Sequence, residues 1–159
     1  AVFFMTTRGI PQWYYGDEIL FEGFGNPLDA LRPDFPGGWD GDKVNKFNPD
    51  NLKGNEKEYY QFIATLANWR KNNEVFKSGK LMQFIPEEGM YVYFRYTDNA
   101  SVMIVLNTNM QATELDTKRF SERMEPYSKG KNVITGETYN SLQKLNVPQQ
   151  SALVIELLK

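Results

Sequence analysis

The stretch MYVYFRYTDNASVMIVLN, residues 90–107, decides the fold because it contains two strand patterns separated by a short turn. In its first part, alternation places one set of apolar side chains on a single face: Met90, Val92, Phe94 and Tyr96. In its second part, the set on one face is Val102, Ile104 and Leu106. The intervening DNA, residues 98–100, is typical of a turn. The stretch therefore predicts an antiparallel hairpin.

The residues that follow the hairpin continue the pattern of short strands separated by turn residues. Strand patterns occur in NVITGETY (132–139), LQKLNVP (142–148) and SALVIELL (151–158). The segment KRFSERM (118–124) is long enough for one or two helical turns. Closely spaced short strands favour an antiparallel sandwich over alternating strands and helices. We therefore predict an all-β domain over residues 79–159, with its boundary near Ser78.

A helix is predicted before this boundary, from Asn55 to Asn73. Asn55 and Glu58 have the spacing of a capping box, which marks the start of a helix. Apolar side chains then recur with a helical period: Tyr59, Phe62, Ile63, Leu66 and Trp69. One face of this helix is therefore apolar and needs a packing partner.

The segment from Asp17 to Lys53 is predicted to be a long loop, because it is rich in Gly, Pro, Asn and Asp. Connections of this length are usually either functional or disordered. Scattered aromatic side chains argue against disorder: Phe21, Phe24, Phe35, Trp39 and Phe47. We therefore expect an ordered, functional loop.

Two short apolar runs precede this loop. AVFFMTT (1–7) begins without an initiator Met, so we expect the chain to be a piece of a longer protein, and its composition allows a strand. PQWYYG (11–16), which ends at a glycine, reads as a buried strand.

Composition excludes several classes of function. The 159 residues include no Cys and no His, which excludes thiol catalysis, His general-base chemistry, disulfides and the usual zinc ligand sets. The formal net charge is −2, and no run of Lys or Arg marks a nucleic-acid partner. No stretch approaches the ~18 continuous apolar residues of a membrane span, so we expect no membrane partner. Composition leaves the cellular location unknown.

Four segments together carry a resemblance to a known family. They are TTRGIPQWYYGDEI (6–19), DALRPDFPGGWDGDKVNKF (29–47), WRKNN (69–73) and FKSGKL (76–81). The sequence resembles the C-terminal portion of the alpha-amylase family of glycoside hydrolases, glycoside hydrolase family 13. Within it, the sequence is most similar to neopullulanase and cyclomaltodextrinase-type enzymes of Bacteroides. GIPQWYYGDE (9–18) matches the family's signature at the eighth barrel strand.

The resemblance implies an α+β fragment with two parts. Residues 1–78 would be the C-terminal remnant of the (β/α)8 catalytic barrel: the end of the seventh helix over 1–7, the last strand over 11–16, a loop and the last helix. Residues 79–159 would be the C-terminal β-sandwich that follows the barrel. Because barrel active sites lie at the C-terminal ends of the strands, Tyr15 and the long loop would form one wall of a sugar-binding cleft.

The resemblance also implies a function for the parent protein. It would be an alpha-glucan hydrolase that cleaves alpha-glucosidic bonds in starch, pullulan or maltodextrins with retention, at the bacterial cell surface or in the periplasm. The family carries its catalytic carboxylates on the fourth, fifth and seventh strands, upstream of Ala1. No catalytic residue is therefore expected here, and the chain alone is expected to be inactive. Asp17 and Glu18 are expected to be structural, because neighbours on a strand point to opposite faces.

Three loop residues are the remaining candidates for substrate binding. In related enzymes, an Asp and an Arg in this loop contact glucose units through charge-assisted hydrogen bonds, and the resemblance assigns this role to Asp29 and Arg32. These two residues are three positions apart, whereas the pair in many relatives is four positions apart. An Asp29–Arg32 pair that only braces the loop explains these residues nearly as well. Trp39 lies among glycines and fits either a ring that stacks on a pyranose or an aromatic plug for the loop.

Other sites are weighed against simpler explanations. The segment DGDKVNKFNPDN (40–51) fails the EF-hand pattern at Val44, Asn45 and Asn51, so no metal site or other cofactor is predicted, although calcium in another geometry stays open. Tyr91, Tyr93 and Tyr96 could form a carbohydrate-binding surface, but packing against a neighbouring part of the protein is the commoner use of such residues.

Two functional classes remain. The first is the C-terminal part of an alpha-glucan hydrolase, whose partner is an alpha-glucan oligosaccharide. The alternative is a stand-alone carbohydrate-binding or structural β-sandwich module. A module has no evident use for a barrel strand, its loop and a helix with an apolar face. Because that face would lack its barrel partners, we also expect the chain to self-associate.

Overall fold

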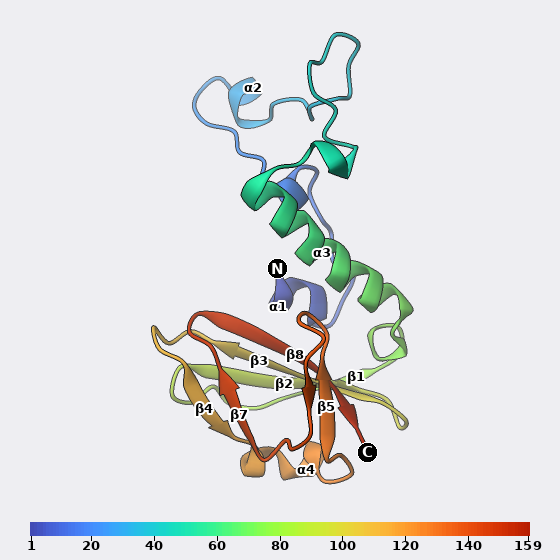
Figure 1. The fold of residues 1–159 in the computed structure, drawn as a ribbon, viewed down its shortest axis with the longest axis vertical. Coiled ribbons are helices and arrows are strands. Elements are labelled where there is room, and N and C mark those ends of the chain that lie inside the picture. Colours follow the sequence, from blue (N-terminus) through green and yellow to red (C-terminus); the bar gives the residue numbers. More distant parts are fainter. The chain divides into compact units, whose positions relative to one another are not determined.

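The structure, a computed structural model, describes residues 1–27 and 30–159, and Leu28 and Asp29 lie outside the described residues. The chain divides into two compact units (Figure 1). The larger unit contains residues 1–10 and 65–159, and the smaller unit contains residues 11–64.

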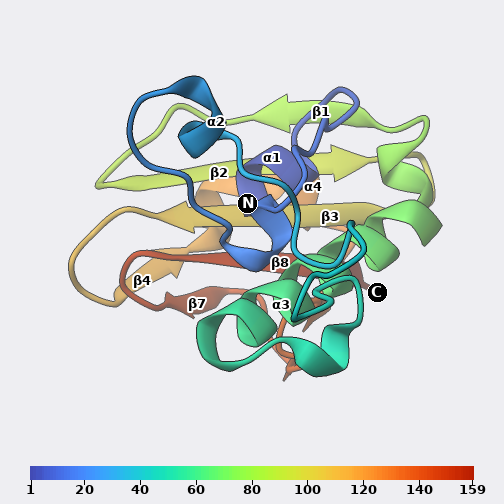
Figure 2. The ribbon, with the colours of Figure 1, turned by 90° about the horizontal axis from the view of Figure 1, so that it is seen from above.

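The larger unit is built on an antiparallel sheet with the strand order β1-β2-β3-β8-β5-β6. Its strands are β1 (Lys80–Gln83), β2 (Met90–Tyr96), β3 (Ser101–Asn107), β8 (Ser151–Leu158), β5 (Lys129–Asn132) and β6 (Thr138–Tyr139). A second sheet pairs β4 (Thr113–Asp116) with β7 (Lys144–Val147). Figures 1 and 2 show β1, β2, β3 and β8 side by side. The predicted mostly antiparallel sandwich is confirmed.

The hairpin predicted from residues 90–107 is present with the expected bounds. β2 pairs with β3 in a register that places Phe94 opposite Met103 and Met90 opposite Asn107. The predicted helical turns after β4 are also present, as the 3-10 helix η4 (Thr117–Phe120) and α4 (Ser121–Met124).

The main core lies between the two sheets and is closed at one side by η4 and α4. The larger sheet contributes alternate residues of β2, β3 and β8, and the smaller sheet contributes Leu115, Leu145 and Val147. Phe120 and Met124 of the short helices complete it. Burying these side chains removes apolar surface from water, which is the dominant favourable contribution to folding.

The other face of the larger sheet is also buried, which the alternation in sequence did not indicate. Tyr93, Ile104 and Val154 are at most 1% exposed. Over this face lies α1 (Val2–Thr6), whose Phe3 ring is 6.0 Å from the Tyr93 ring, edge to face. The Thr6 and Tyr93 hydroxyls are 2.5 Å apart. The strand that composition allowed over residues 1–7 is therefore not formed, and the helix implied there is present.

The three tyrosines considered as one carbohydrate-binding surface do not share a face of the sheet. Tyr91 and Tyr93 share the α1-covered face, where their rings are 5.2 Å apart, whereas Tyr96 packs against the main core on the opposite face. The three side chains therefore do not form one carbohydrate-binding surface. Packing, the simpler explanation, is correct.

Arg95 is a buried arginine, 3% exposed, that ties several segments to the larger sheet. Its guanidinium donates hydrogen bonds to the carbonyl oxygens of Thr7 at 2.9 Å, Val75 at 3.0 Å and Gly79 at 3.2 Å. It also lies over the Phe76 ring, 5.1 Å from the ring centroid, in the 3-10 helix η3 (Glu74–Phe76). Desolvation by burial lowers the pKa of Arg95 from its ordinary value.

α3 (Gly54–Asn72) confirms the predicted helix over residues 55–73. It starts one residue earlier than expected, so Asn55 lies inside the first turn and the predicted capping position is wrong. Residues 54–64 belong to the smaller unit and residues 65–72 to the larger one. Ile63 and Leu66 on its apolar face are buried.

In the smaller unit, the strand predicted over residues 11–16 is absent. Tyr14 is 54% exposed and Tyr15 44% exposed, so the expectation of a buried strand is wrong. A strand is stabilised by hydrogen bonds to a neighbouring strand, and this segment is not part of either sheet. Asp17 and Glu18 lie instead in the 3-10 helix η1 (Asp17–Ile19), so the argument from alternating strand faces does not apply to them.

The predicted long loop is largely irregular, interrupted by η1, α2 (Leu28–Leu31) and the 3-10 helix η2 (Pro49–Asn51). Aromatic rings order it from within. The Phe35 ring is 4.5 Å from the Phe47 ring and 6.2 Å from the Phe21 ring. These contacts join three of the five aromatic residues that argued against disorder, and the Phe47 side chain remains 63% exposed.

Candidate carbohydrate-binding site

The first part of the candidate site is a pair of adjacent tyrosines that precede η1. The rings of Tyr14 and Tyr15 are 4.6 Å apart and inclined by 35°. The Tyr15 hydroxyl donates a 3.3 Å hydrogen bond to the Pro33 carbonyl oxygen, which fixes this ring against the segment that follows α2. Both rings stay exposed enough to contact a ligand.

Two charged residues influence the pKa of the Tyr15 hydroxyl. The pKa of Tyr15 is raised above its ordinary value, chiefly by hydrogen bonding with Tyr14, and the negative charge of Asp34 adds to this effect. The positive charge of Arg32 opposes it. Arg32 directly precedes Pro33, whose carbonyl oxygen accepts the Tyr15 hydrogen bond, whereas the side chain of Asp29 lies outside the described residues.

Trp39 lies on a tight loop held by Asp42. One oxygen of the Asp42 carboxylate, Oδ2, accepts hydrogen bonds from the backbone N–H of Gly37 at 2.7 Å and of Trp39 at 3.2 Å. Gly37 has φ +103°, and a Cβ there would lie 2.5 Å from Cα of Asn45, so only glycine fits this close approach. The Trp39 side chain is 66% exposed, which is unlike a buried plug.

Several acidic and amide side chains around this loop form ion pairs or hydrogen bonds with other residues of the smaller unit. Lys46 pairs with Glu56, and Asn51 Nδ2 donates a 2.8 Å hydrogen bond to the Asn45 carbonyl oxygen. Among the described residues, no group of three or more acidic side chains could hold a metal ion. The described helices include none that is long and apolar enough to cross a membrane.

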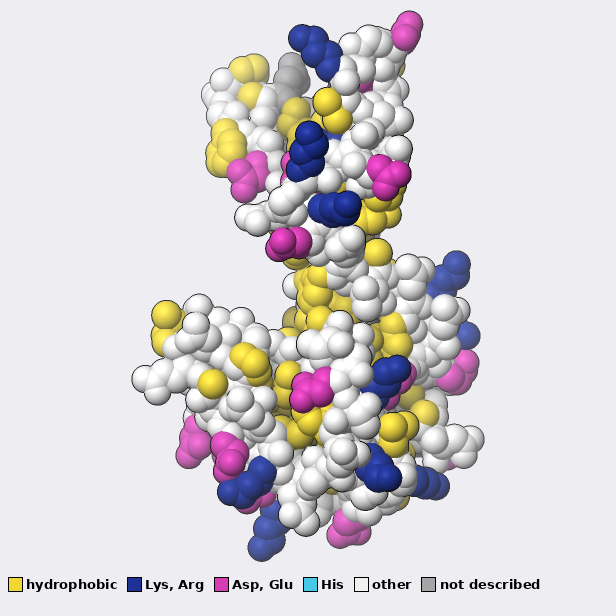
Figure 3. Space-filling view, in the orientation of Figure 1, with side chains coloured by type: hydrophobic (Ala, Val, Ile, Leu, Met, Phe, Trp, Pro, Cys, Tyr) yellow, Lys and Arg dark blue, Asp and Glu magenta, His cyan; other side chains and the backbone are white. Residues whose placement is uncertain are grey.

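Charge is distributed without a dominant sign. In the face shown in Figure 3, acidic and basic side chains are interspersed over the surface. This distribution differs from the basic patch by which proteins bind nucleic acids.

Comparison with known proteins now identifies the sandwich. Residues 81–156 match the family model described as the cyclomaltodextrinase C-terminal domain. Residues 81–156 therefore form a C-terminal domain of the kind found in alpha-amylase family glycoside hydrolases. The match covers β1 to β8, and therefore both sheets and the core between them.

Two curated proteins are similar to this chain over most of its length. A cyclomaltodextrin glucanotransferase of Klebsiella oxytoca is 26% identical over 95% of the chain, which spans 22% of that relative. A cyclomaltodextrinase of Geobacillus thermopakistaniensis is 28% identical over 87% of the chain, which spans 21% of that relative. The chain therefore spans about a fifth of the length of these curated relatives.

The fold is also similar to that of solved structures. A variant of AmyP in complex with maltotriose superimposes with a TM-score of 0.70 and 16% identity, over 98% of this chain and 33% of AmyP. The likeness extends beyond the sandwich into residues 1–78, because it covers nearly the whole chain.

Sequence reasoning missed one exposed side chain of the candidate site. Tyr14 stacks beside Tyr15 and is more exposed, yet only Tyr15 was selected from the sequence. The two consecutive tyrosines before Gly16 could have indicated a paired aromatic surface. The predicted strand argued against it, because neighbouring side chains on a strand point to opposite faces. Since residues 11–16 form no strand, both rings lie together.

Proposed function

We propose that this chain is the C-terminal part of an alpha-glucan hydrolase and that it supplies one wall of the substrate cleft. Residues 1–78 would be the end of the (β/α)8 barrel, and residues 79–159 the β-sandwich after it. The observation that carries the proposal is the exposed Tyr14–Tyr15 pair, in which the Tyr15 hydroxyl is hydrogen-bonded to Pro33, the residue after Arg32, in a chain whose sandwich matches this family.

The chemistry of these residues suits an oligosaccharide. Exposed aromatic rings present flat apolar faces, and Arg32 can donate paired hydrogen bonds to neighbouring hydroxyl groups. Asp29 and Trp39 would add further contacts with glucose units. The AmyP variant, which shares the fold, is in complex with maltotriose, and this supports an alpha-glucan as the ligand of the parent protein.

The missing strand over residues 11–16 is consistent with this proposal. In a complete barrel, the eighth strand pairs with the first and the seventh, which would satisfy its backbone hydrogen bonds. We infer that the segment becomes a strand only when those neighbours are present.

Catalysis is assigned to the upstream part of the parent protein. Retaining hydrolysis needs a nucleophile and an acid/base carboxylate about 5 to 5.5 Å apart. In the smaller unit, Asp42 accepts two backbone hydrogen bonds and Glu56 pairs with Lys46, so these carboxylates have structural roles. The isolated chain should therefore release no sugar from pullulan or maltoheptaose.

Three further properties complete the proposal. The parent enzyme would act at the bacterial cell surface or in the periplasm, and a Bacteroides-type source stays a prediction. The isolated chain would self-associate, because half-buried aromatic side chains of α3, such as Tyr59 and Phe62, would otherwise meet water.

The deciding experiment measures hydrolysis by the full-length parent. Arg32→Ala and Tyr15→Ala should each lower kcat/KM for maltoheptaose about ten-fold, mainly through KM, because a binding contact is lost while the reacting groups remain. Asp29→Ala should act in the same direction. Lys43→Ala, an exposed residue of the same unit, is the control and should have no effect.

Two results would contradict the proposal. One is sugar release by the isolated chain after removal of host amylases, which would place catalytic groups within it. The other is a reading frame with no barrel upstream of Ala1, which would favour the stand-alone sandwich module.

A further inference from the structure

A concave site lies within the sandwich unit, between η4–α4 and the segment that enters β7. It is a groove of about 700 Å³ formed by residues 116–128 and 140–144. Pairing of β4 with β7 brings these two segments together, with Asp116 opposite Lys144. The volume falls within the range of about 300–1,000 Å³ that small-molecule sites occupy.

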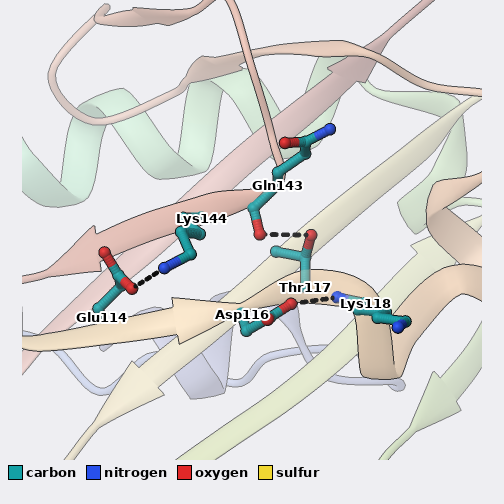
Figure 4. Close-up of polar contacts among 6 residues, drawn as sticks. All are labelled: Glu114, Asp116, Thr117, Lys118, Gln143 and Lys144. Atoms are coloured by element: carbon teal, nitrogen blue, oxygen red, sulfur yellow. Dashed lines mark hydrogen bonds and ion pairs between the residues drawn. The ribbon is translucent and has the colours of Figure 1, made fainter.

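Hydrogen bonds fix the base of the groove. Thr117, 5% exposed, donates through Oγ1 to the Leu142 carbonyl oxygen at 2.7 Å, and its backbone N–H donates to the Gln143 carbonyl oxygen at 3.0 Å. Asp116 Oδ1 accepts a 2.9 Å hydrogen bond from the Lys118 backbone N–H. Figure 4 shows Thr117 turned to the Gln143 carbonyl, with the Gln143 amide group pointing away from this contact. The groove is therefore preorganised before any ligand arrives.

The lining combines an apolar floor with polar side chains at the rim. Met124 and Leu142 are buried members of the core, and the half-buried Tyr127 packs beside them. In the part of the chain that the structure describes, the exposed side chains of Asn140 and Gln143 have no protein hydrogen-bond partner. An aromatic and aliphatic floor with amide groups at the rim matches a ligand that has both C–H faces and hydroxyl groups.

Charges at the groove cancel. The groove lining has two acidic side chains, Asp116 and Glu125, and two basic ones, Lys118 and Lys144, so the formal charge of the lining is zero. Lys144 also forms an ion pair with Glu114, which lies outside the lining, at 2.6 Å. An anionic or a cationic ligand would therefore gain little net attraction here. The lining favours a neutral ligand.

We propose that this groove binds a neutral oligosaccharide, with its sugar rings against Tyr127 and its hydroxyl groups on Asn140 and Gln143. The choice of an alpha-glucan as that oligosaccharide rests on the proposed function. The residues involved belong to the matched C-terminal domain, and none of them belongs to the proposed cleft wall.

The test is an NMR titration of the full chain with maltotriose and, separately, with cellotriose. Amide resonances of residues 116–128 and 140–144 should shift and saturate, with a dissociation constant of about 1 mM or below, which suits a small half-open site. Saturable shifts confined to residues 11–64, or no shifts with either sugar, would overturn the proposal.

A pair of matched double variants tests the named contacts. Asn140→Ala/Gln143→Ala should weaken binding about ten-fold, because two hydrogen-bonding amides are lost. Asn146→Ala/Gln149→Ala removes the same two side-chain types from exposed positions outside the groove and should leave binding unchanged. Equal affinities of the two variants would contradict the assignment, and melting temperatures verify that both are folded.

The two sugars separate this proposal from the preceding one. Binding of maltotriose in the groove supports both the groove and its alpha-glucan ligand. Binding of cellotriose alone supports the groove as an oligosaccharide site but counts against an alpha-glucan as its ligand. The cleft-wall proposal is tested independently by Arg32→Ala in the parent enzyme.

Discussion

The indole Nε1 of Trp69 donates a 2.6 Å hydrogen bond to Oε1 of Glu156, which joins α3 to β8. Asn73 Nδ2 donates to the same oxygen at 3.0 Å. The Trp69 ring also packs edge to face on Phe76, at 4.9 Å between centroids. One carboxylate on the sheet thus holds the C-terminal end of α3, so residues 65–72 fold as part of the sandwich unit.

Replacing Glu156 should measure the strength of this connection. Glu156→Ala should lower the free energy of unfolding by about 1–3 kcal/mol, because two side-chain donors lose their shared acceptor. Glu156→Gln keeps an acceptor oxygen and should cost less. Urea denaturation measures both, with the exposed Glu122→Ala as the control. Equal stability of Glu156→Ala and Glu122→Ala would contradict the role of this contact.

Arg95 should be intolerant of a change to lysine. A lysine ammonium cannot reach three carbonyl oxygens in the planar arrangement of a guanidinium, and it would remain buried. Arg95→Lys should therefore lower stability by about 2–4 kcal/mol in urea denaturation. The matched control is Arg123→Lys, since Arg123 lies over the Tyr96 ring near the surface and makes one backbone hydrogen bond. The prediction fails if both variants unfold at the same urea concentration.

Stability should fall at alkaline pH because of Tyr93. Burial is the main reason that the pKa of its hydroxyl is raised from 10.0 to about 12 in the folded chain. Above about pH 10 the unfolded chain releases this proton while the folded chain keeps it, so stability decreases with pH by up to about 3 kcal/mol near pH 12.

Tyr93→Phe tests this dependence. At neutral pH the variant should lose about 1 kcal/mol with the hydrogen bond to Thr6. Between about pH 10 and pH 12, its stability should fall less steeply than that of the unmodified chain. Urea midpoints measured across this range give the comparison. Parallel pH profiles of the two proteins would rule out Tyr93 as the cause.

The loop that carries Trp39 should depend on Asp42. Asp42→Ala removes the acceptor of two backbone N–H groups, so the amides of Gly37 and Trp39 should exchange with solvent about ten-fold faster or more. Asp40→Ala changes an exposed carboxylate in the same loop and is the control. Hydrogen exchange followed by NMR gives the rates, and unchanged protection in Asp42→Ala would contradict the prediction.

The elements predicted correctly are those whose pattern is local. The hairpin of β2 and β3 could be read from sequence because alternation and a turn lie within 18 consecutive residues. The strand expected over residues 11–16 has the composition of a strand, but composition cannot supply the neighbouring strand that it needs. The predicted start of α3, at Asn55, differs from the observed start at Gly54 by one residue. Differences of one or two residues are usual at helix ends.

Long-range contacts explain what the sequence could not indicate about the sites. Arg95 and Glu156 make contacts with residues at least 16 positions away, and no spacing rule marks a buried charge. The groove has the same origin, because the pairing of β4 with β7 joins Asp116 to Lys144 across the sequence. Tyr15 and Arg32 were selected through the family resemblance, and not from a periodic pattern.

The position of β8 bears on how the protein is made. The last strand in the sequence lies between β3 and β5, so residues 151–158 join the two halves of the larger sheet. During translation, the edges of β3 and β5 that pair with β8 remain unpaired until residues 151–158 leave the ribosome. Because open strand edges promote aggregation, the nascent chain is vulnerable until residues 151–158 have emerged and paired with both strands.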